Sequence, residues 1–374
     1  MRIAVEARVL CLKELRGIGS YLCELLAAWP EREDSFVLLT PGPIPPERLR
    51  CQAQVEVVEV PEPRGSRFRV WDWWSMPRAV RRASPDLLWS PANQAVPMGG
   101  VPQVVTIHDT LLQEHVLHDK YFDRLFHNIV SPFWVRRYAK SVVSVSGFSS
   151  QRIQTVFSCE ASRVRVIHNG ASLPGRPWRD KEQAREQMRG KGFVGRPYVL
   201  SLGAESPWKN SEGTIRAFAL VSRKNPDVDF VLAGVQKRAR EPLLHLREQL
   251  GLEGRLRILD FLEAADRDAL YQGAEVFVYP SLFEGFGLPP LEAMALGTPV
   301  VASDAASIPE VVGEAALLTD ASDPSSLAQS ILAVLGDPDL ARGLVAAGRG
   351  NIERFKWEDS ARAHRDLFKE CLAP

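Results

Sequence analysis

Residues 281–301 read SLFEGFGLPPLEAMALGTPVV and place three glycines and three prolines between a strand-like and a helix-like run. The apolar run just before them, EVFVYPS, is typical of a buried strand. After it, PPLEAMALG predicts a helix with proline in its first turn and Gly297 as its C-terminal stop. The strand-to-helix loop is then predicted to consist of Gly285, Phe286, Gly287 and Leu288.

The same alternation of strand and helix runs through the whole chain. Apolar runs of strand length, such as QVVTIHD, SVVSVS, PYVLSLG and DFVLAG, are separated by longer helix-like segments. This rhythm predicts an α/β protein with parallel sheets and crossover helices. Because 374 residues exceed the size at which a single core stops growing, we expect two doubly wound, Rossmann-like domains facing each other across a cleft.

A boundary between the two domains is indicated by residues 169–197, where Gly, Pro and charged residues are concentrated. Within this stretch, residues 180–189 have the composition of a helix. We therefore predict an N-terminal domain over residues 1–175 and a C-terminal domain over residues 176–355. The remaining residues, 356–374, are predicted to form a helix that packs back on the N-terminal domain.

Composition limits the classes of function. Basic and acidic residues are equal at 46 each, so the chain lacks the overall basic charge of a nucleic-acid-binding protein. The five cysteines are scattered without a CxxC pair, which argues against a disulfide framework and a zinc site. No run reaches the roughly 18 apolar residues of a membrane span, and MRIAVEARVL does not resemble a signal peptide. We expect a cytoplasmic protein whose membrane contact, if any, is peripheral.

The loop at 285–288 has the chemistry of an anion site. Its glycines allow backbone N–H groups to approach a ligand, and the following helix N-terminus carries a partial positive charge, so the loop suits a phosphate or diphosphate. An alternative is a tight turn in which Glu292 stabilises the helix dipole. Glu284 and Glu292 flank the loop, and we expect them to bracket an elongated ligand such as a nucleotide sugar.

Residues 280–303, PSLFEGFGLPPLEAMALGTPVVAS, resemble the signature of the retaining glycosyltransferases of family 4, which have the GT-B fold and two glutamates separated by seven residues. The resemblance implies that Glu284 contacts the donor sugar and that Glu292 binds the ribose hydroxyls. It also implies an acceptor-side N-terminal domain and a nucleotide-sugar-binding C-terminal domain. The loop residues whose backbone would hold sugar and diphosphate are Gly285, Phe286, Gly287 and Leu288.

A second landmark of that family is similar to residues 202–221, LGAESPWKNSEGTIRAFALV. The similarity implies that Lys209 is the cation against the donor diphosphate. Taken by itself, a lysine at this position would more often be a solvated surface residue. Many relatives carry arginine where this chain has Trp208, and a second phosphate cation is often found where it has Ala204. Because of these two differences, the sequence does not say how many cations other than Lys209 would contact the diphosphate.

Two features of the N-terminal half match the same family. Gly17 and Gly19 are predicted to follow the first strand just ahead of a helix, and the resemblance places Gly19 near the donor phosphates. His108 and Asp109 follow a strand directly, where relatives with the same HD pair place it beside the reacting sugar. The alternatives are a structural histidine and an aspartate that caps the next helix. The other histidines of this region are treated as ordinary residues: His115, His118 and His127.

A metal-dependent glycosyltransferase of the other main fold would need Asp-x-Asp after a strand. The DVD at 227–229 precedes a strand instead, and the DPD at 337–339 lies between predicted helices, so both are interpreted as turns. We therefore expect no metal and no cofactor, with the nucleoside diphosphate sugar as co-substrate.

Residues 64–82 combine arginines with Trp71, Trp73 and Trp74, and Asp72 is their only acid. Such a segment could dock on an anionic membrane surface or hold an acceptor. The alternative is that the tryptophans pack in the core beneath an arginine-covered helix.

The combined prediction is transfer of a hexose from a nucleoside diphosphate sugar to a glycan or lipid-linked acceptor, with retention of configuration and without nucleic acid. EGFGLPPLEAMA resembles bacterial mannosyl- and rhamnosyltransferases of surface polysaccharide assembly, so mannose from GDP-mannose is the first candidate. Two alternatives stay open, a non-catalytic binder of nucleotide sugars or glycans and a nucleotide-sugar epimerase of the same fold.

Overall fold

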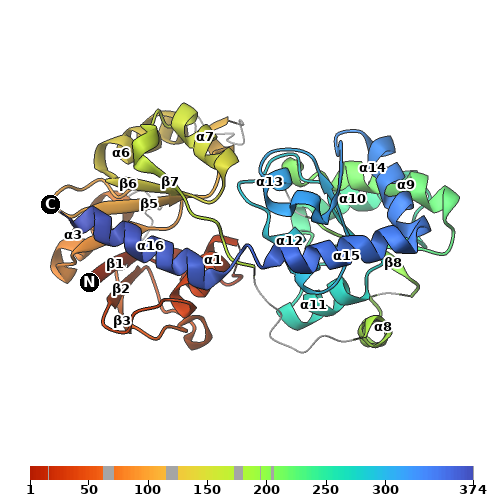
Figure 1. Cartoon of the computed structure of the whole chain (residues 1–374), viewed down its shortest axis with the longest axis horizontal. Helices are drawn as coiled ribbons and strands as arrows, with labels where there is room; N and C mark the ends of the chain where they lie inside the picture. The colour runs from red at the N-terminus through yellow and green to blue at the C-terminus, as the bar shows by residue number, and fades with distance from the viewer. Residues whose placement is uncertain are drawn as a thin grey trace. The chain divides into compact units, whose positions relative to one another are not determined.

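The computed structural model describes residues 1–15, 17–61, 71–114, 125–171, 180–193, 195–203 and 206–373. They form two compact units, each described by itself below. Unit 1 comprises Met1–Gly170 and Phe355–Pro374, and unit 2 comprises Ala171–Arg354. The last helix, α16 (Trp357–Leu372), thus belongs to the same unit as the N-terminus and packs against α1 (Gly17–Ala27) (Figure 1).

Unit 1 is built on a seven-stranded parallel sheet with the order β3-β2-β1-β4-β5-β6-β7. The apolar runs of strand length in the first half, QVVTIHD and SVVSVS among them, form strands, because short β-branched runs between turn residues can bury both faces only inside such a sheet. The strands are β1 (Arg2–Glu6), β2 (Ser35–Thr40), β3 (Gln54–Glu59), β4 (Leu87–Ser90), β5 (Gln103–Ile107), β6 (Ser141–Ser144) and β7 (Val164–Val166).

Helices cover both faces of this sheet. On one face Ala4 lies opposite Val37 and Leu88 in the neighbouring strands, and this row packs against Met76 and Val80 of α3 (Met76–Ala83). The other face carries α1 and α16. The helices α6 (Ser131–Tyr138) and α7 (Gly147–Val156) pack against β5 and β6. The helix α1 begins at Gly17, so Gly17 and Gly19 lie in its first turn and not ahead of the helix as predicted.

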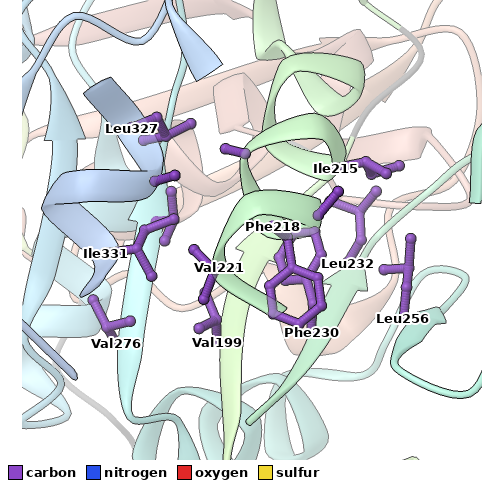
Figure 2. Packing of buried hydrophobic residues seen from close by; sticks show 14 of the residues in the cluster. Val199, Ile215, Phe218, Val221, Phe230, Leu232, Leu256, Val276, Leu327 and Ile331 are labelled. Carbon is purple, nitrogen blue, oxygen red and sulfur yellow. The ribbon is translucent and has the colours of Figure 1, made fainter. Parts of the chain in front are cut away.

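Unit 2 has a six-stranded parallel sheet with the order β10-β9-β8-β11-β12-β13. Leu256, Phe230, Val199 and Val276 form one cross-strand row that packs beneath Phe218 and its neighbours (Figure 2). The last strand was missed by the sequence analysis because it is a three-residue edge strand with one exposed leucine. The strands are β8 (Tyr198–Leu202), β9 (Asp229–Ala233), β10 (Leu256–Ile258), β11 (Val276–Tyr279), β12 (Val300–Ser303) and β13 (Leu317–Thr319).

The helices of unit 2 begin where local sequence signals favour them. Asp323 and Asp337 accept hydrogen bonds from backbone N–H groups in the first turns of α14 (Pro324–Gly336) and α15 (Pro338–Ile352), so DPD at 337–339 is a helix cap. Asp229, from the DVD, opens β9 and pairs with Arg255. The helices are α8 (Lys181–Gly190), α9 (Ser211–Lys224), α10 (Lys237–Gln249), α11 (Ala264–Gly273), α12 (Leu288–Ala295), α13 (Ile308–Val312), α14 (Pro324–Gly336) and α15 (Pro338–Ile352).

Within the residues described above, none of the helices combines the length and the apolar character that crossing a bilayer requires.

Candidate active site

The loop after β11 leads directly into α12. Gly287 is the residue before the helix and has a φ of 101°, a conformation that residues with a side chain rarely adopt. Leu288 is the first residue of α12 and not part of the loop as predicted, because the helix begins one residue earlier than the prolines suggest. Gly297 follows the helix with a φ of 74°, which confirms the predicted stop.

Contacts from two other loops help to hold this loop in place. The buried hydroxyl of Ser307, which follows β12, lies 2.9 Å from the carbonyl oxygen of Glu284 and 3.0 Å from that of Phe286. The backbone N–H of Leu282 donates to the carbonyl oxygen of Trp208 at 2.8 Å. Because Trp208 follows β8 and β8 pairs with β11, the second contact joins the loops at the carboxyl ends of two adjacent strands.

Lys209 and Glu284 meet between these two loops. Lys209 Nζ lies 2.6 Å from Glu284 Oε1 and donates to the Tyr279 hydroxyl at 3.1 Å. The two side chains are 30% and 16% exposed, so the pair is partly open to solvent. Burial opposes the charge on Lys209, but Tyr279 and Glu284 outweigh it and raise the pKa of the ammonium. The structure thus keeps a cation beside the first glutamate of the motif.

Glu292 is held by a different pair of residues. It is the fifth residue of α12, whose first turn contains no acid, so the alternative in which it stabilises the helix dipole as a first-turn acid is wrong. The Tyr271 hydroxyl donates to Glu292 Oε2 at 3.1 Å, and Arg267 Nε lies 3.9 Å from the same oxygen. Burial is the main cause that raises the pKa of Tyr271, and the negative charge of Glu292 raises it further. The hydroxyl therefore stays protonated and donates to Glu292.

The HD pair lies in unit 1, at the carboxyl end of β5. His108 Nε2 lies 2.8 Å from the carbonyl oxygen of Pro91, which can only accept, so Nε2 carries the proton. Burial lowers the pKa of His108 to about 4, despite the opposing effect of this hydrogen bond. Asp109 Oδ1 accepts the N–H of Leu111 at 3.0 Å, at the start of α4 (Leu111–Glu114), as the capping interpretation predicts. The role of the pair beside a sugar stays a prediction.

The structure therefore brings Lys209 and Glu284 together on the loops after β8 and β11, and it places Glu292 on α12 beside Tyr271 and Arg267. Gly19 belongs to unit 1, where a Cβ atom would be 2.6 Å from the Leu15 side chain, and its place near the donor phosphates stays a prediction. Several residues that the sequence analysis considered lie outside the described residues: His115, His118, Ala204 and, from the segment 64–82, Arg64, Arg67 and Arg69.

Tyr279, Tyr271 and Ser307 belong to the site and were missed by the sequence analysis, as was Arg267 beside Glu292. Tyr279 could have been identified from the sequence, because it carries the only hydroxyl group in the otherwise apolar strand β11. Nothing in the sequence marks Tyr271 or Ser307 as a site residue, since each reaches the site from a helix or loop that is distant in the chain.

Comparison with known proteins agrees with this architecture. The family model described as "Glycosyl transferases group 1" matches residues 183–351, and the model described as "Glycosyltransferase Family 4" matches residues 15–173. A crystal structure of Anabaena Alr3699/HepE in complex with UDP and glucose superposes with a TM-score of 0.79 at 20% identity, covering 98% of this chain and 99% of that one. The fold is GT-B, with two Rossmann-like domains, as predicted.

Proteins similar in sequence to this chain include named bacterial enzymes. The chain is 32% identical over 232 residues to O-antigen chain mannosyltransferase B of Escherichia coli, covering 62% of this chain and 61% of the relative. It is 31% identical over 297 residues to alpha-maltose-1-phosphate synthase of Mycolicibacterium smegmatis, covering 73% and 74%. It matches the serotype-specific mannosyltransferase WbdA of Escherichia coli at 30% identity, over 74% of this chain and 35% of that protein. The chain belongs to glycosyltransferase family 4.

The chain spans about three fifths of O-antigen chain mannosyltransferase B, at 61%, and about a third of WbdA, at 35%.

Proposed function

We propose that the protein transfers a hexose from a nucleoside diphosphate sugar to a hydroxyl of a glycan or lipid-linked glycan, with retention of configuration, in surface polysaccharide synthesis. The observation that carries the proposal is the 2.6 Å contact between Lys209 Nζ and Glu284 Oε1 beside the N-terminus of α12. A cation and a helix N-terminus suit a diphosphate, and an adjacent carboxylate suits sugar hydroxyls.

In this proposal the reaction proceeds on one face of the sugar. The bond between the anomeric carbon and the diphosphate oxygen breaks, and the acceptor oxygen forms a bond to that carbon from the same side. The acceptor proton passes to the departing diphosphate oxygen, so the products are a glycoside and a nucleoside diphosphate. Lys209 stabilises the charge that grows on the leaving group. His108 and Asp109 retain their predicted role beside the reacting sugar.

Mannose is the first candidate for the sugar, with GDP-mannose as donor. Two of the relatives described above are named as mannosyltransferases, and this supports mannose over other hexoses. The structure of Anabaena Alr3699/HepE contains UDP and glucose, so UDP-glucose is the appropriate competing donor. We propose a cytoplasmic location and a reaction that needs no metal or other cofactor.

The test is a transfer assay with purified protein, GDP-mannose or UDP-glucose, and an undecaprenyl-linked glycan acceptor, with and without a chelator. We expect transfer from GDP-mannose, unchanged by the chelator, and a product with the anomeric configuration of the donor by NMR. Donor binding without hydrolysis or transfer would favour the non-catalytic binder. Conversion of the donor into another nucleotide sugar without acceptor would favour the epimerase.

A further inference from the structure

Large apolar side chains are exposed on two helical segments of unit 1. The first segment, residues 71–83, contains η3 (Trp71–Ser75) and α3, and the second, residues 125–140, contains η4 (Phe126–Val130) and α6 (Figure 1). Trp71 is buried, whereas two neighbouring tryptophans are not, so the core interpretation is right for Trp71 only. The exposed fractions are 62% for Trp74, 59% for Ile129, 50% for Phe133, 49% for Trp73 and 37% for Leu125.

The two segments lie side by side on the same layer of the unit. The ring of Trp73 packs edge-on against Trp134, with 5.5 Å between the ring centroids. The strand register places both segments on the same face of the sheet. Leu88, in the core beneath α3, and Ser90 lie on one face of β4. Ser90 is opposite Val105 of β5, whose side chain belongs to the core beneath α6. We call the exposed side chains of residues 71–83 and 125–140 the basic aromatic face.

The charges of this face have one sign. The exposed cations are Arg78, Arg81, Arg82, Arg136, Arg137 and Lys140, and within the described part of the chain none of them pairs with a carboxylate.

The acids around the face do not cancel these charges. Asp72, the only acid in the two segments, is buried and is bonded to Arg8 and Gln94. Glu56 and Glu59 of the edge strand β3 border a hollow next to Arg78 and Arg82, and Arg2 pairs with Glu56 at 2.8 Å. The cations therefore remain in excess on this face.

We propose that the basic aromatic face docks unit 1 on the surface of a bilayer that contains anionic phospholipid. Tryptophan and long basic side chains are favoured at the level of lipid headgroups, where an apolar body and a polar end are both accommodated. The face also exposes the apolar side chains of Ile129, Phe133 and Leu125. Lipid acyl chains would bury this apolar surface, whereas a free phosphate ion would not. The cations supply the attraction to the anionic headgroups.

A second copy of the chain fits this face less well. A symmetric dimer pairs a surface with itself, and here it would bring arginines against arginines. The Arg78 guanidinium already stacks on its own Trp74, 3.5 Å from the ring centroid, which leaves a cationic and not an apolar outer surface. The inference goes beyond the proposed function, since docking needs neither donor nor acceptor and is measured without them.

The test is co-sedimentation of the full chain with vesicles of phosphatidylcholine, or of phosphatidylcholine mixed with phosphatidylglycerol, at low and high salt. We expect binding to the anionic vesicles, weakened by salt. Arg81→Glu/Arg82→Glu should lower the partition coefficient at least about tenfold. Ile129→Ser/Phe133→Ser should lower it at least about tenfold, since a tenfold loss corresponds to fewer than two buried CH₂ groups and these substitutions remove more than two.

Matched controls lie in unit 2. Arg216→Glu/Arg223→Glu changes the charge equally on exposed positions of α9, and Phe261→Ser removes a ring as exposed as that of Phe133, at 51% against 50%. Circular dichroism melts verify that each variant is folded. The proposal is overturned if the variants bind like the wild type or if neutral vesicles bind equally well. It is also overturned if single-stranded RNA binds more tightly than anionic vesicles, or if the face proves to mediate dimerisation in sedimentation velocity without lipid.

Discussion

The hydroxyl oxygen of Tyr21 lies 2.8 Å from Nε2 of His364, joining two residues 343 positions apart in the chain. His364 Nδ1 lies 2.8 Å from the carbonyl oxygen of Ser360, so Nδ1 carries the proton and Nε2 accepts from Tyr21. The Tyr21 ring also packs edge-on against His108 with 4.7 Å between centroids. The last helix of the chain is thereby tied, through one tyrosine, to the predicted HD pair.

Tyr21→Phe should destabilise unit 1 because it leaves His364 Nε2 buried without its donor. An unsatisfied buried acceptor costs about 1–3 kcal/mol, and calorimetry should show a lower melting temperature. Tyr138→Phe is the control, since the Tyr138 hydroxyl has no hydrogen bond within the described structure and should melt like the wild type. Equal melting of the two variants would contradict the prediction.

Acid should destabilise the protein through two histidines. Burial lowers the pKa of His364 to about 4, as it does for His108. An unfolded histidine titrates near 6.5, so the contribution to stability is complete above that pH and is lost as pH falls toward 4. The slope is about 1.4 kcal/mol per pH unit for each histidine.

The measurement compares melting temperatures between pH 7 and 4 for wild type and for His364→Gln, whose pH dependence should be shallower. His245→Gln replaces an exposed histidine of α10 and should follow the wild type. Parallel curves for His364→Gln and wild type would show that this imidazole does not contribute.

Lys209→Ala should depress turnover because it removes the cation held beside Glu284. Loss of one preorganised donor to a developing charge typically lowers kcat by roughly 10² to 10³-fold. Steady-state kinetics with GDP-mannose and acceptor provide the measurement. Lys224→Ala replaces an exposed lysine at the end of α9, the helix that follows Lys209 in the chain, and should keep normal kinetics. Transfer by Lys209→Ala within about twofold of wild type would remove Lys209 from the mechanism.

Tyr271→Phe should raise the donor KM with little change in kcat, since it frees Glu292 from its 3.1 Å hydrogen bond. We expect about a tenfold rise, the size of one hydrogen bond to a charged group. Tyr198→Phe is the matched control, because the Tyr198 hydroxyl is also buried in unit 2 and donates to the Leu270 carbonyl oxygen at 2.7 Å. Both variants should lose stability, and only Tyr271→Phe should change KM. A normal KM would assign Tyr271 to packing alone.

Gly170→Ala should lower the melting temperature because a Cβ atom there would lie 2.4 Å from the Trp357 ring and 2.5 Å from the Trp357 backbone nitrogen. Backbone cannot give way as a flexible side chain can, so we expect a loss of about 1–3 kcal/mol. Gly343→Ala, in the exposed middle of α15 with nothing within 4 Å, should be neutral or stabilising. A Gly170→Ala variant as stable as Gly343→Ala would contradict the geometry.

Much of the fold could be predicted from local patterns. Short β-branched runs bounded by Gly, Pro and Asp located every strand except β13, and Gly297 marked the end of α12. The errors fall at boundaries, as at Gly17 and Leu288, where a helix begins one or two residues away from its strongest signal. The exposure of Trp73 and Trp74 could not be predicted, because an aromatic pattern does not say which ring the core has room for.

By itself the sequence determined the family, the parallel α/β architecture and the loop from Gly285 to Gly287, because glycine turns depend on residues within a few positions. Only the tertiary structure decided that Lys209 meets Tyr279 and Glu284, that Tyr271 holds Glu292, and that the last helix reaches Tyr21. Those contacts follow from which strands are neighbours in each sheet and from how side chains fill the space between layers, and no local pattern encodes either.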